Sequence, residues 1–288
     1  TRGYWLIAQR RAMSVLVMAL VALCQAMATV AFHTVTGNRI ITPSIMGFEA
    51  LYVAIHTTTV FFFGAVGLAN ARTLEIFILQ LVLMVGFSML LYSWLLTGRN
   101  NMHAMLLIGV VIGGGLGSLS TFMQRMLSPS EFDVLTARLF GSVNNADPEY
   151  FPVAIPLALG AALLLYIHSR TLNVVSLGRE TAVNLGVNHR AHSIYVLVLV
   201  AVLMAISTAL VGPMTFLGFL VATLAYQFAD TYDHRYIFPM AVLIGFVVLS
   251  GSYFIMNHIF YAQGIVSIII ELVGGIVFLA VILRKGTL

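Results

Sequence analysis

The segment Ser176-Leu-Gly-Arg-Glu-Thr-Ala-Val-Asn-Leu-Gly-Val187 is short and polar and stands between two long apolar runs. Gly178 is suited to begin a helix here, and Gly186 to end one in the left-handed conformation that glycine adopts without steric cost. Glu180 falls in the first turn, where the helix dipole favours a negative charge. Three residues form a small apolar side: Ala182, Val183 and Leu185. Because so short a helix is unstable alone, we expect it to dock on neighbouring helices or on a partner, although spacing alone leaves open an ordinary loop helix.

The composition around this segment is that of a membrane protein. Of the 288 residues, 60% are hydrophobic and 8% are charged, whereas water-soluble domains carry about 25% charged residues. The apolar runs are continuous and lack the two-residue alternation of a membrane β-barrel. We therefore predict an all-α fold, a polytopic transmembrane helical bundle forming one domain over residues 1–288. The 14 Lys and Arg residues form no basic stripe, so nucleic acid is not an expected partner.

Nine apolar segments approach the length needed to cross a hydrocarbon core about 30 Å thick. They are Ala12–Phe32, Ile45–Leu68, Leu74–Leu96, Met102–Met126, Phe151–Ile167, Ser193–Val211, Thr215–Phe228, Tyr236–Phe254 and Val266–Leu283. The seventh is short, so we expect it to be broken at Gly218 or tilted. Nine spans place the termini on opposite sides. We expect that a first spanning helix is absent from this chain, with a native nine-span protein as the alternative.

Loop charges set the orientation. If residues 172–190 form a cytoplasmic loop, eight basic residues share that side: Arg39, Arg99, Arg170, Arg179, Arg190, Arg235, Arg284 and Lys285. The loops of the opposite face hold three: Arg72, Arg125 and Arg138. The positive-inside rule supports this orientation, although Arg2, Arg10 and Arg11 then lie on the external side.

The external loop 127–150 is the only sizeable hydrophilic segment. Ser128-Pro-Ser-Glu131 has the pattern of a helix start, because Ser can cap a helix and Glu three residues later can complete the capping box. Three residues then form one apolar stripe: Phe132, Leu135 and Leu139. We predict a short helix lying at the membrane interface.

Few residues carry catalytic potential. The sequence has no phosphate-binding loop, no Ser/His/Asp constellation and no cofactor fingerprint, and its loop histidines His189, His192 and His234 lack metal-ligand spacing. A buried carboxylate is costly and often functional in membranes. Glu49 is open between a functional role and a helix-end role, while Glu271 is expected to face the bundle. Together with His56 they leave a proton-coupled transporter open as an alternative; a membrane-embedded enzyme finds no converging groups.

The stretch Ile112-Gly-Gly-Gly-Leu-Gly-Ser-Leu-Ser120 places small residues inside a span. Gly113 and Gly117 are four residues apart on one face, so another helix can approach closely. Three others could instead line a polar passage: Gly114, Ser118 and Ser120. Both readings hold if this helix lies at a subunit interface around a pore.

Several segments together resemble the iron–siderophore ABC permease family (FecCD type), which includes the cobalamin permease. Leu177–Val187 looks like its cytoplasmic coupling helix, and Asn38-Arg-Ile-Ile-Thr-Pro-Ser-Ile-Met-Gly-Phe48 resembles the loop between its second and third helices. Most members have Asn-Pro-Leu-Ala there, and the version here is closer to the catecholate-siderophore branch. Gly212-Pro-Met-Thr-Phe-Leu-Gly-Phe219 resembles the family's Gly-Pro-x-x-Phe-x-Gly segment. Gln263-Gly-Ile-Val266, followed by Gly274-Gly275, resembles its last helix pair.

The resemblance implies roles for particular residues. The ATPase contact is Gly178, Arg179, Glu180, Thr181, Ala182, Asn184, Leu185 and Gly186. The cytoplasmic gate is Asn38 and Ile40. The translocation path includes Gly113, Gly114, Gly117, Ser118 and Ser120. Arg11 matches an arginine that docks the binding protein, whereas the family's second docking arginine has no counterpart in Phe254–Gln263.

The resemblance also implies an assembly. Two permease subunits of the ten-helix fold enclose a passage, two ATPase subunits hold ATP and Mg on the cytoplasmic face, and an external binding protein delivers the substrate. This chain then binds no cofactor or metal and is no enzyme; it imports a ferric siderophore, of catecholate type, across the bacterial cytoplasmic membrane. A heterodimer of permeases is favoured over a homodimer. Haem and cobalamin stay open as substrates.

Overall fold

The computed structural model describes residues 2–70, 72–97, 102–259 and 266–285, and every regular element in these ranges is a helix. The α-helices are α1 (Arg2–Thr36), α2 (Phe48–Asn70), α3 (Leu74–Thr97), α4 (Met102–Gln124), α5 (Pro129–Leu139), α6 (Phe151–Ile167), α7 (Ser169–Val175), α8 (Arg179–Asn184), α9 (His189–Val211), α10 (Leu217–Phe228), α11 (His234–His258) and α12 (Val266–Lys285). Short 3₁₀ turns lie at Ser44–Met46, Val143–Asn145 and Pro148–Tyr150.

The helices match the nine predicted segments. Among the described residues, six helices are long and apolar enough to cross a membrane, and three shorter apolar helices accompany them: Leu74–Leu90, Leu217–Phe228 and Val266–Val281. The prediction of an all-α membrane bundle is confirmed. The seventh segment is short because residues 212–216 are not helical, so that α10 starts only at Leu217. Gly218 does not break α10; it lies where the helix approaches Thr29 and Gln25 of α1 too closely for any side chain.

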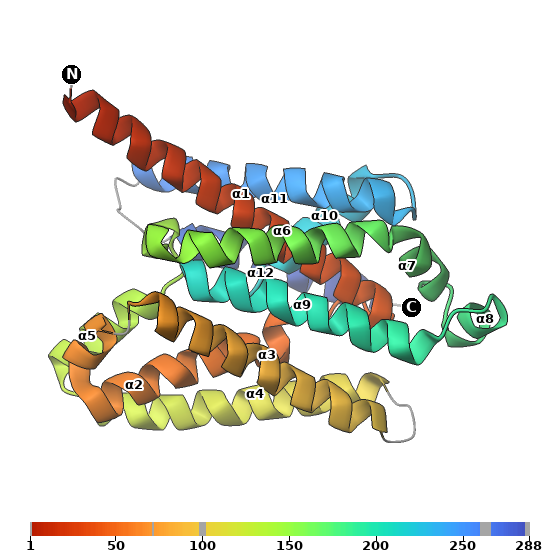
Figure 1. Cartoon of the computed structure of the whole chain (residues 1–288), viewed down its shortest axis with the longest axis horizontal. Coiled ribbons are helices and arrows are strands. Elements are labelled where there is room, and N and C mark those ends of the chain that lie inside the picture. Colours follow the sequence, from red (N-terminus) through yellow and green to blue (C-terminus); the bar gives the residue numbers. More distant parts are fainter. Residues whose placement is uncertain (1, 71, 98–101, 260–265, 286–288) are drawn as a thin grey trace.

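Two helices form the centre of the bundle. Most of α1 from Val17 onward is buried, as is most of α9. A helix that is apolar on all sides is expected to be buried on all sides. The two helices pack on each other, and α6, α10 and α11 contact α1. Figure 1 shows α1 crossing the bundle obliquely, with α2, α3, α4 and α5 grouped on one side of α9. Small residues such as Ala22, which faces Gly245 of α11, allow this close packing.

The two ends of the bundle differ. In Figure 1, α5 and the start of α1 lie at one end, and α7 and α8 lie at the other. The predicted capping box is present at α5: the Ser128 hydroxyl accepts the Glu131 N–H, and the Glu131 carboxylate accepts the Ser128 N–H at 3.0 Å. Leu135 is buried with Leu139 against it. Phe132 is 42% exposed and does not pack into this bundle as Leu135 does. Placement of α5 at a membrane interface stays a prediction.

Candidate functional site

Helix α8, which we call the coupling helix, has a glycine at each end. Gly178 precedes it with φ +97°, and Gly186 follows it with φ +82°. The Gly186 N–H donates to the Val183 carbonyl, and the Val187 N–H donates to the Ala182 carbonyl, both at 2.9 Å. This pair of bonds is a Schellman motif, which satisfies carbonyls that a helix end would otherwise leave open. The predicted helix start and end are confirmed.

The coupling helix stands largely outside the bundle. Ala182 is fully buried and fixes α8 to its neighbours, α7 and α9. Val183 and Leu185 are 54% and 60% exposed, and so is Leu177 at 60%. The apolar side expected from the sequence is therefore divided, since only Ala182 packs on this chain. We call the exposed set Leu177, Val183 and Leu185 the coupling patch. The remaining predicted contact residues, from Gly178 to Thr181, Asn184 and Gly186, are exposed as well.

One asparagine side chain shapes the loop after α1. The Asn38 carboxamide oxygen accepts the N–H of Ile40 at 2.8 Å and of Ile41 at 3.2 Å. Such a bond replaces a backbone turn. Asn38 and Ile40 are both half-buried beside the end of α1. The loop then leads to Gly47, whose φ of +99° only glycine adopts easily, and there it reaches the middle of α4.

The glycines of α4 face two different environments. A side chain at Gly113 would lie 3.1 Å from the Gly47 Cα, so Gly113 permits a close approach, although to a turn and not to a helix. Within the described residues nothing lies within 4 Å of a side chain at Gly117, so a close approach by a helix of another subunit stays a prediction there. Gly114, Gly117 and Ser118 line an open hollow on α4, together with Thr121, Phe122 and Arg125. Ser120 is buried away from it.

The hydroxyls along this hollow bond to their own helix. Ser118 donates to the Gly114 carbonyl and Thr121 donates to the Gly117 carbonyl, each at 2.9 Å. Their donor capacity is thereby used. The wall of the hollow offers a ligand weak acceptors and small apolar surfaces, with Arg125 at one end.

The buried carboxylate Glu49 has a structural role. It lies in the first turn of α2 and accepts the Met214 N–H at 3.0 Å as well as the Thr215 hydroxyl. These bonds hold the non-helical segment between α9 and α10. By contrast, Glu271 on α12 is exposed overall, although its carboxylate lies beside the backbone of Thr215 in the segment between α9 and α10. His56 is buried with its ring 4.3 Å from that of Tyr52.

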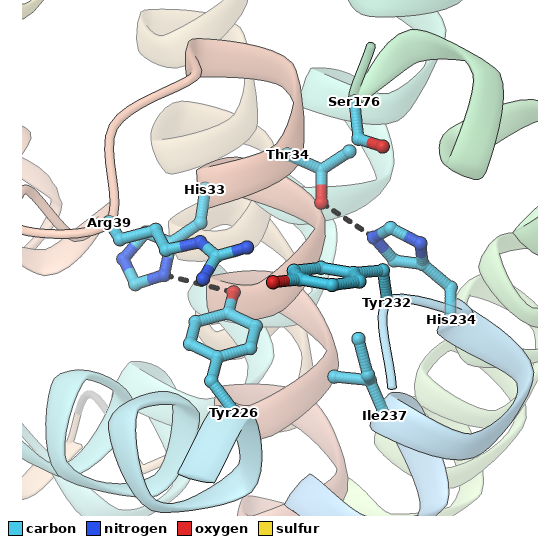
Figure 2. Close-up of a pocket in the computed structure, with 8 residues that line it drawn as sticks. All are labelled: His33, Thr34, Arg39, Ser176, Tyr226, Tyr232, His234 and Ile237. Carbon is cyan, nitrogen blue, oxygen red and sulfur yellow. Dashed lines mark hydrogen bonds between the residues drawn. The ribbon is translucent and has the colours of Figure 1, made fainter. Parts of the chain in front are cut away.

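A polar pocket that the sequence did not reveal lies between the ends of α1, α10 and α11. Figure 2 shows it, and we call it the arginine pocket, lined among others by His33, Thr34, Arg39, Tyr226, Tyr232 and His234. Its volume is about 90 Å³. His33 Nδ1 lies 3.2 Å from the Tyr226 hydroxyl, and the Arg39 guanidinium lies 4.5 Å above the Tyr226 ring. Its residues come from segments far apart in the sequence. The one feature of the sequence that hinted at this pocket is the presence of histidines at the ends of apolar runs.

A hydrogen-bond network connects this pocket to α7. The Asn173 carboxamide oxygen accepts the backbone N–H of His234 at 3.0 Å and lies 2.5 Å from its Nδ1, while His234 Nε2 lies 2.6 Å from the Thr34 hydroxyl. The Asn173 amide donates to Asp233 at 3.0 Å. Hydrogen bonds from Arg235 and Asn173 lower the pKa of Asp233 well below its ordinary value. Helix α7, which leads into α8, is thus bonded to the start of α11 and, through His234, to Thr34 of α1.

Arg11 lies at the other end of the molecule. It is exposed on the part of α1 that projects beyond the bundle, at the end that carries α5. The predicted sites therefore separate into two groups: Arg11 at one end, and the coupling helix and the Asn38 loop toward the other. The Gln263 motif lies outside the described residues, apart from Val266 at the start of α12.

The chain is similar to known transport proteins. The chain is 56% identical to the petrobactin import system permease protein FatC of Bacillus anthracis, over 98% of this chain and 80% of that protein. It is 26% identical to the petrobactin permease FatD of the same organism, over 62% of this chain and 53% of FatD. Its fold matches an inward-facing ABC transporter described as of the metal-chelate type, with a TM-score of 0.81 and 21% identity, covering 95% of this chain and 87% of that one. The FecCD transport family model matches residues 3–284, and the chain belongs to that family.

Proposed function

We propose that this chain is a membrane-spanning permease subunit of an ABC importer and that it takes up a ferric siderophore of the petrobactin class. The observation that carries the proposal is the coupling helix. It is closed by a glycine at each end, anchored by Ala182 and exposed along the coupling patch. A set of exposed apolar residues at the end of a bundle is typical of a docking surface for another protein. The family and the likeness to FatC support an ATPase subunit as that protein.

The proposed assembly supplies what this chain lacks. Two ATPase subunits hold ATP and Mg, and one of them grips Gly178–Gly186. An external binding protein docks at the end that carries Arg11. The second permease is a relative of this chain, as in a heterodimer, because FatC and FatD are two petrobactin permeases from one organism. We place the assembly in the bacterial cytoplasmic membrane, and this chain contributes no catalysis.

The hollow on α4 is the proposed wall of the passage. Transport requires a site that a substrate can leave, so strong ligands along the path would slow it. Gly114, Gly117 and Ser118 fit this need because they give space and no free hydroxyl donor. Gly113 does not line the hollow; it allows the turn at Gly47 to pack closely on α4. We assign Asn38 and Ile40 to the gate, since they shape the loop that connects α1 to α2 and that touches α4 at Gly47.

A proton-driven transporter is the weaker alternative. Glu49 already accepts hydrogen bonds from Met214 and Thr215, so protonating it would disturb the segment between α9 and α10. The relatives of this chain are ABC permeases, which favours ATP as the source of energy.

The test is uptake by proteoliposomes that contain this chain, a second permease, the ATPase and the binding protein. We expect ferric petrobactin to enter only with ATP, and to enter equally when a protonophore removes the proton gradient. Hemin and cyanocobalamin serve as competing substrates. Uptake that stops with the protonophore and continues without ATP would refute the proposal, and uptake of hemin alone would refute the siderophore assignment.

A further inference from the structure

The arginine pocket has a cation and no carboxylate in its wall. Figure 2 shows the guanidinium of Arg39 lying over Tyr226 and beside the hydroxyl end of Tyr232. The ring face of Tyr226 holds this cation by a cation–π contact. Among the described residues Arg39 forms no ion pair, since the one salt bridge there joins Arg235 to Asp233. Within the part of the chain that the structure describes, no carboxylate pairs with the positive charge of the pocket.

The neighbouring groups add hydrogen-bonding capacity. Tyr232 is 80% exposed and extends across the mouth of the pocket. Ser176, which directly follows α7, also lines it. The nearest carboxylate, Asp233, already accepts from Arg235 and from Asn173. A metal cation is disfavoured here because Arg39 would repel it, whereas a guanidinium matches the geometry of an oxyanion and can bind it with two parallel hydrogen bonds.

We propose that the arginine pocket is a binding site for a phosphate-class oxyanion, either the free ion or the phosphate of a lipid head group. The volume of about 90 Å³ exceeds the roughly 10–15 Å³ that one water needs, and it suits one tetrahedral oxyanion with a few waters. Arg39 supplies the charge and the Tyr232 hydroxyl supplies a further donor, while the Ser176 hydroxyl donates to the Asn173 carbonyl at 2.7 Å and only lines the wall. The pocket is lined by Ser176, just before α8, and so lies at the end that the proposed function places in the cytoplasm.

The residues that line this site come from three separate segments of the chain. Arg39 belongs to the loop after α1, Ser176 to the start of the coupling segment, and Tyr232 to the connection between α10 and α11. A bound oxyanion bridges the loop that carries Arg39 and the connection that carries Tyr232, next to Ser176. The site is independent of the siderophore, so its test can fail while the proposed transport function stands.

The test compares the assembled wild-type transporter with Arg39→Gln in phosphatidylcholine nanodiscs, titrated with inorganic phosphate against chloride of equal ionic strength. The readout is the thermal unfolding midpoint of the permease, which a ligand of the folded state raises. Phosphate bound by the ATPase subunits affects both proteins alike. Arg190→Gln, which removes an exposed arginine of α9 outside the pocket, is the matched control. A second set of nanodiscs contains phosphatidic acid.

We expect phosphate to stabilise the wild type and Arg190→Gln, and to bind Arg39→Gln about tenfold to a hundredfold more weakly, since charged hydrogen bonds are lost. Arg39→Lys keeps the positive charge but loses the paired N–H donors of the guanidinium, so we expect its affinity for phosphate to lie between those of the wild type and Arg39→Gln. If only phosphatidic acid separates wild type from Arg39→Gln, the occupant is a lipid head group. If neither probe separates them, the site does not exist.

Discussion

Replacing Gly113 by Ala tests how α4 is held against the loop after α1. The added Cβ would lie 3.1 Å from the Cα and 3.3 Å from the N of Gly47. These are backbone atoms, so they cannot rotate away as a side chain would. Overpacking of this kind costs about 1–3 kcal/mol, whereas exchanging Gly for Ala within a helix gains about 0.5–1 kcal/mol. We expect Gly113→Ala to lower the free energy of unfolding by up to about 2 kcal/mol.

The matched control is two residues away in the same helix. Gly115 has nothing within 4 Å of the position that a Cβ would take, so Gly115→Ala keeps the helix gain without the clash. The unfolding free energies of the two variants should therefore differ by about 1–3 kcal/mol, because the gain in helix propensity is the same in both. Thermal unfolding in nanodiscs, followed by near-UV circular dichroism, measures it. Equal midpoints for the two variants would show that Gly47 and Gly113 do not pack as described.

Three further predictions concern the coupling patch, the buried carboxylate and a loop aspartate. Leu185→Asp leaves the fold intact because Leu185 is 60% exposed, and we expect it to reduce ATP-driven uptake at least about tenfold by removing apolar docking area; unchanged uptake would contradict the docking role. Glu49→Leu leaves the buried Met214 N–H without its acceptor, at a cost of about 1–3 kcal/mol in unfolding free energy; an unchanged unfolding midpoint would argue against that bond. The lowered pKa of Asp233 means that its contribution to stability is present above its ordinary pKa of 3.8 and is lost as the pH falls through the folded value. Unfolding midpoints of Asp233→Asn measured from neutral to acid pH should lack this loss, and a curve parallel to wild type would refute it.

The sequence was sufficient for features that depend on local chemistry. The caps of α8 at Gly178 and Gly186 follow from the conformational freedom of glycine, and the start of α5 at Ser128 follows from the capping box. The number of apolar segments follows from membrane thickness. None of these needs a distant partner.

What the sequence could not predict depends on contacts between distant segments. Nothing in the pattern around Gly117 says that its face stays open while Gly113 meets a turn, because each glycine follows a large aliphatic residue and precedes a small one. The exposure of Val183 beside the burial of Ala182 reflects where α7 and α9 lie. The arginine pocket combines residues up to two hundred positions apart, as in the bond between Thr34 and His234.

The link from the coupling helix into the bundle has a polar route and an apolar route. The apolar route is α9, whose buried face packs on α1. The polar route is α7, where Asn173 bonds His234 and His234 bonds Thr34. Packed apolar contacts resist displacement, while a chain of hydrogen bonds can break and re-form between two arrangements. A movement of α8 can therefore reach α1 through α7 by this chain of bonds as well as by the direct packing of α7 on α1.

This reasoning predicts coupling between the two ends of the polar route. Asn173→Ala removes the acceptor of His234 and a donor to Asp233, and Thr34→Val removes the hydroxyl at the far side. If the three residues act as one unit, the double variant should lose less unfolding free energy than the sum of the single variants, by about 0.5–3 kcal/mol. Ser250→Ala, which removes a hydroxyl that bonds only within α11, paired with Asn173→Ala is the control and should be additive. Strict additivity in both pairs would mean that α7 transmits movement to α1 by packing alone.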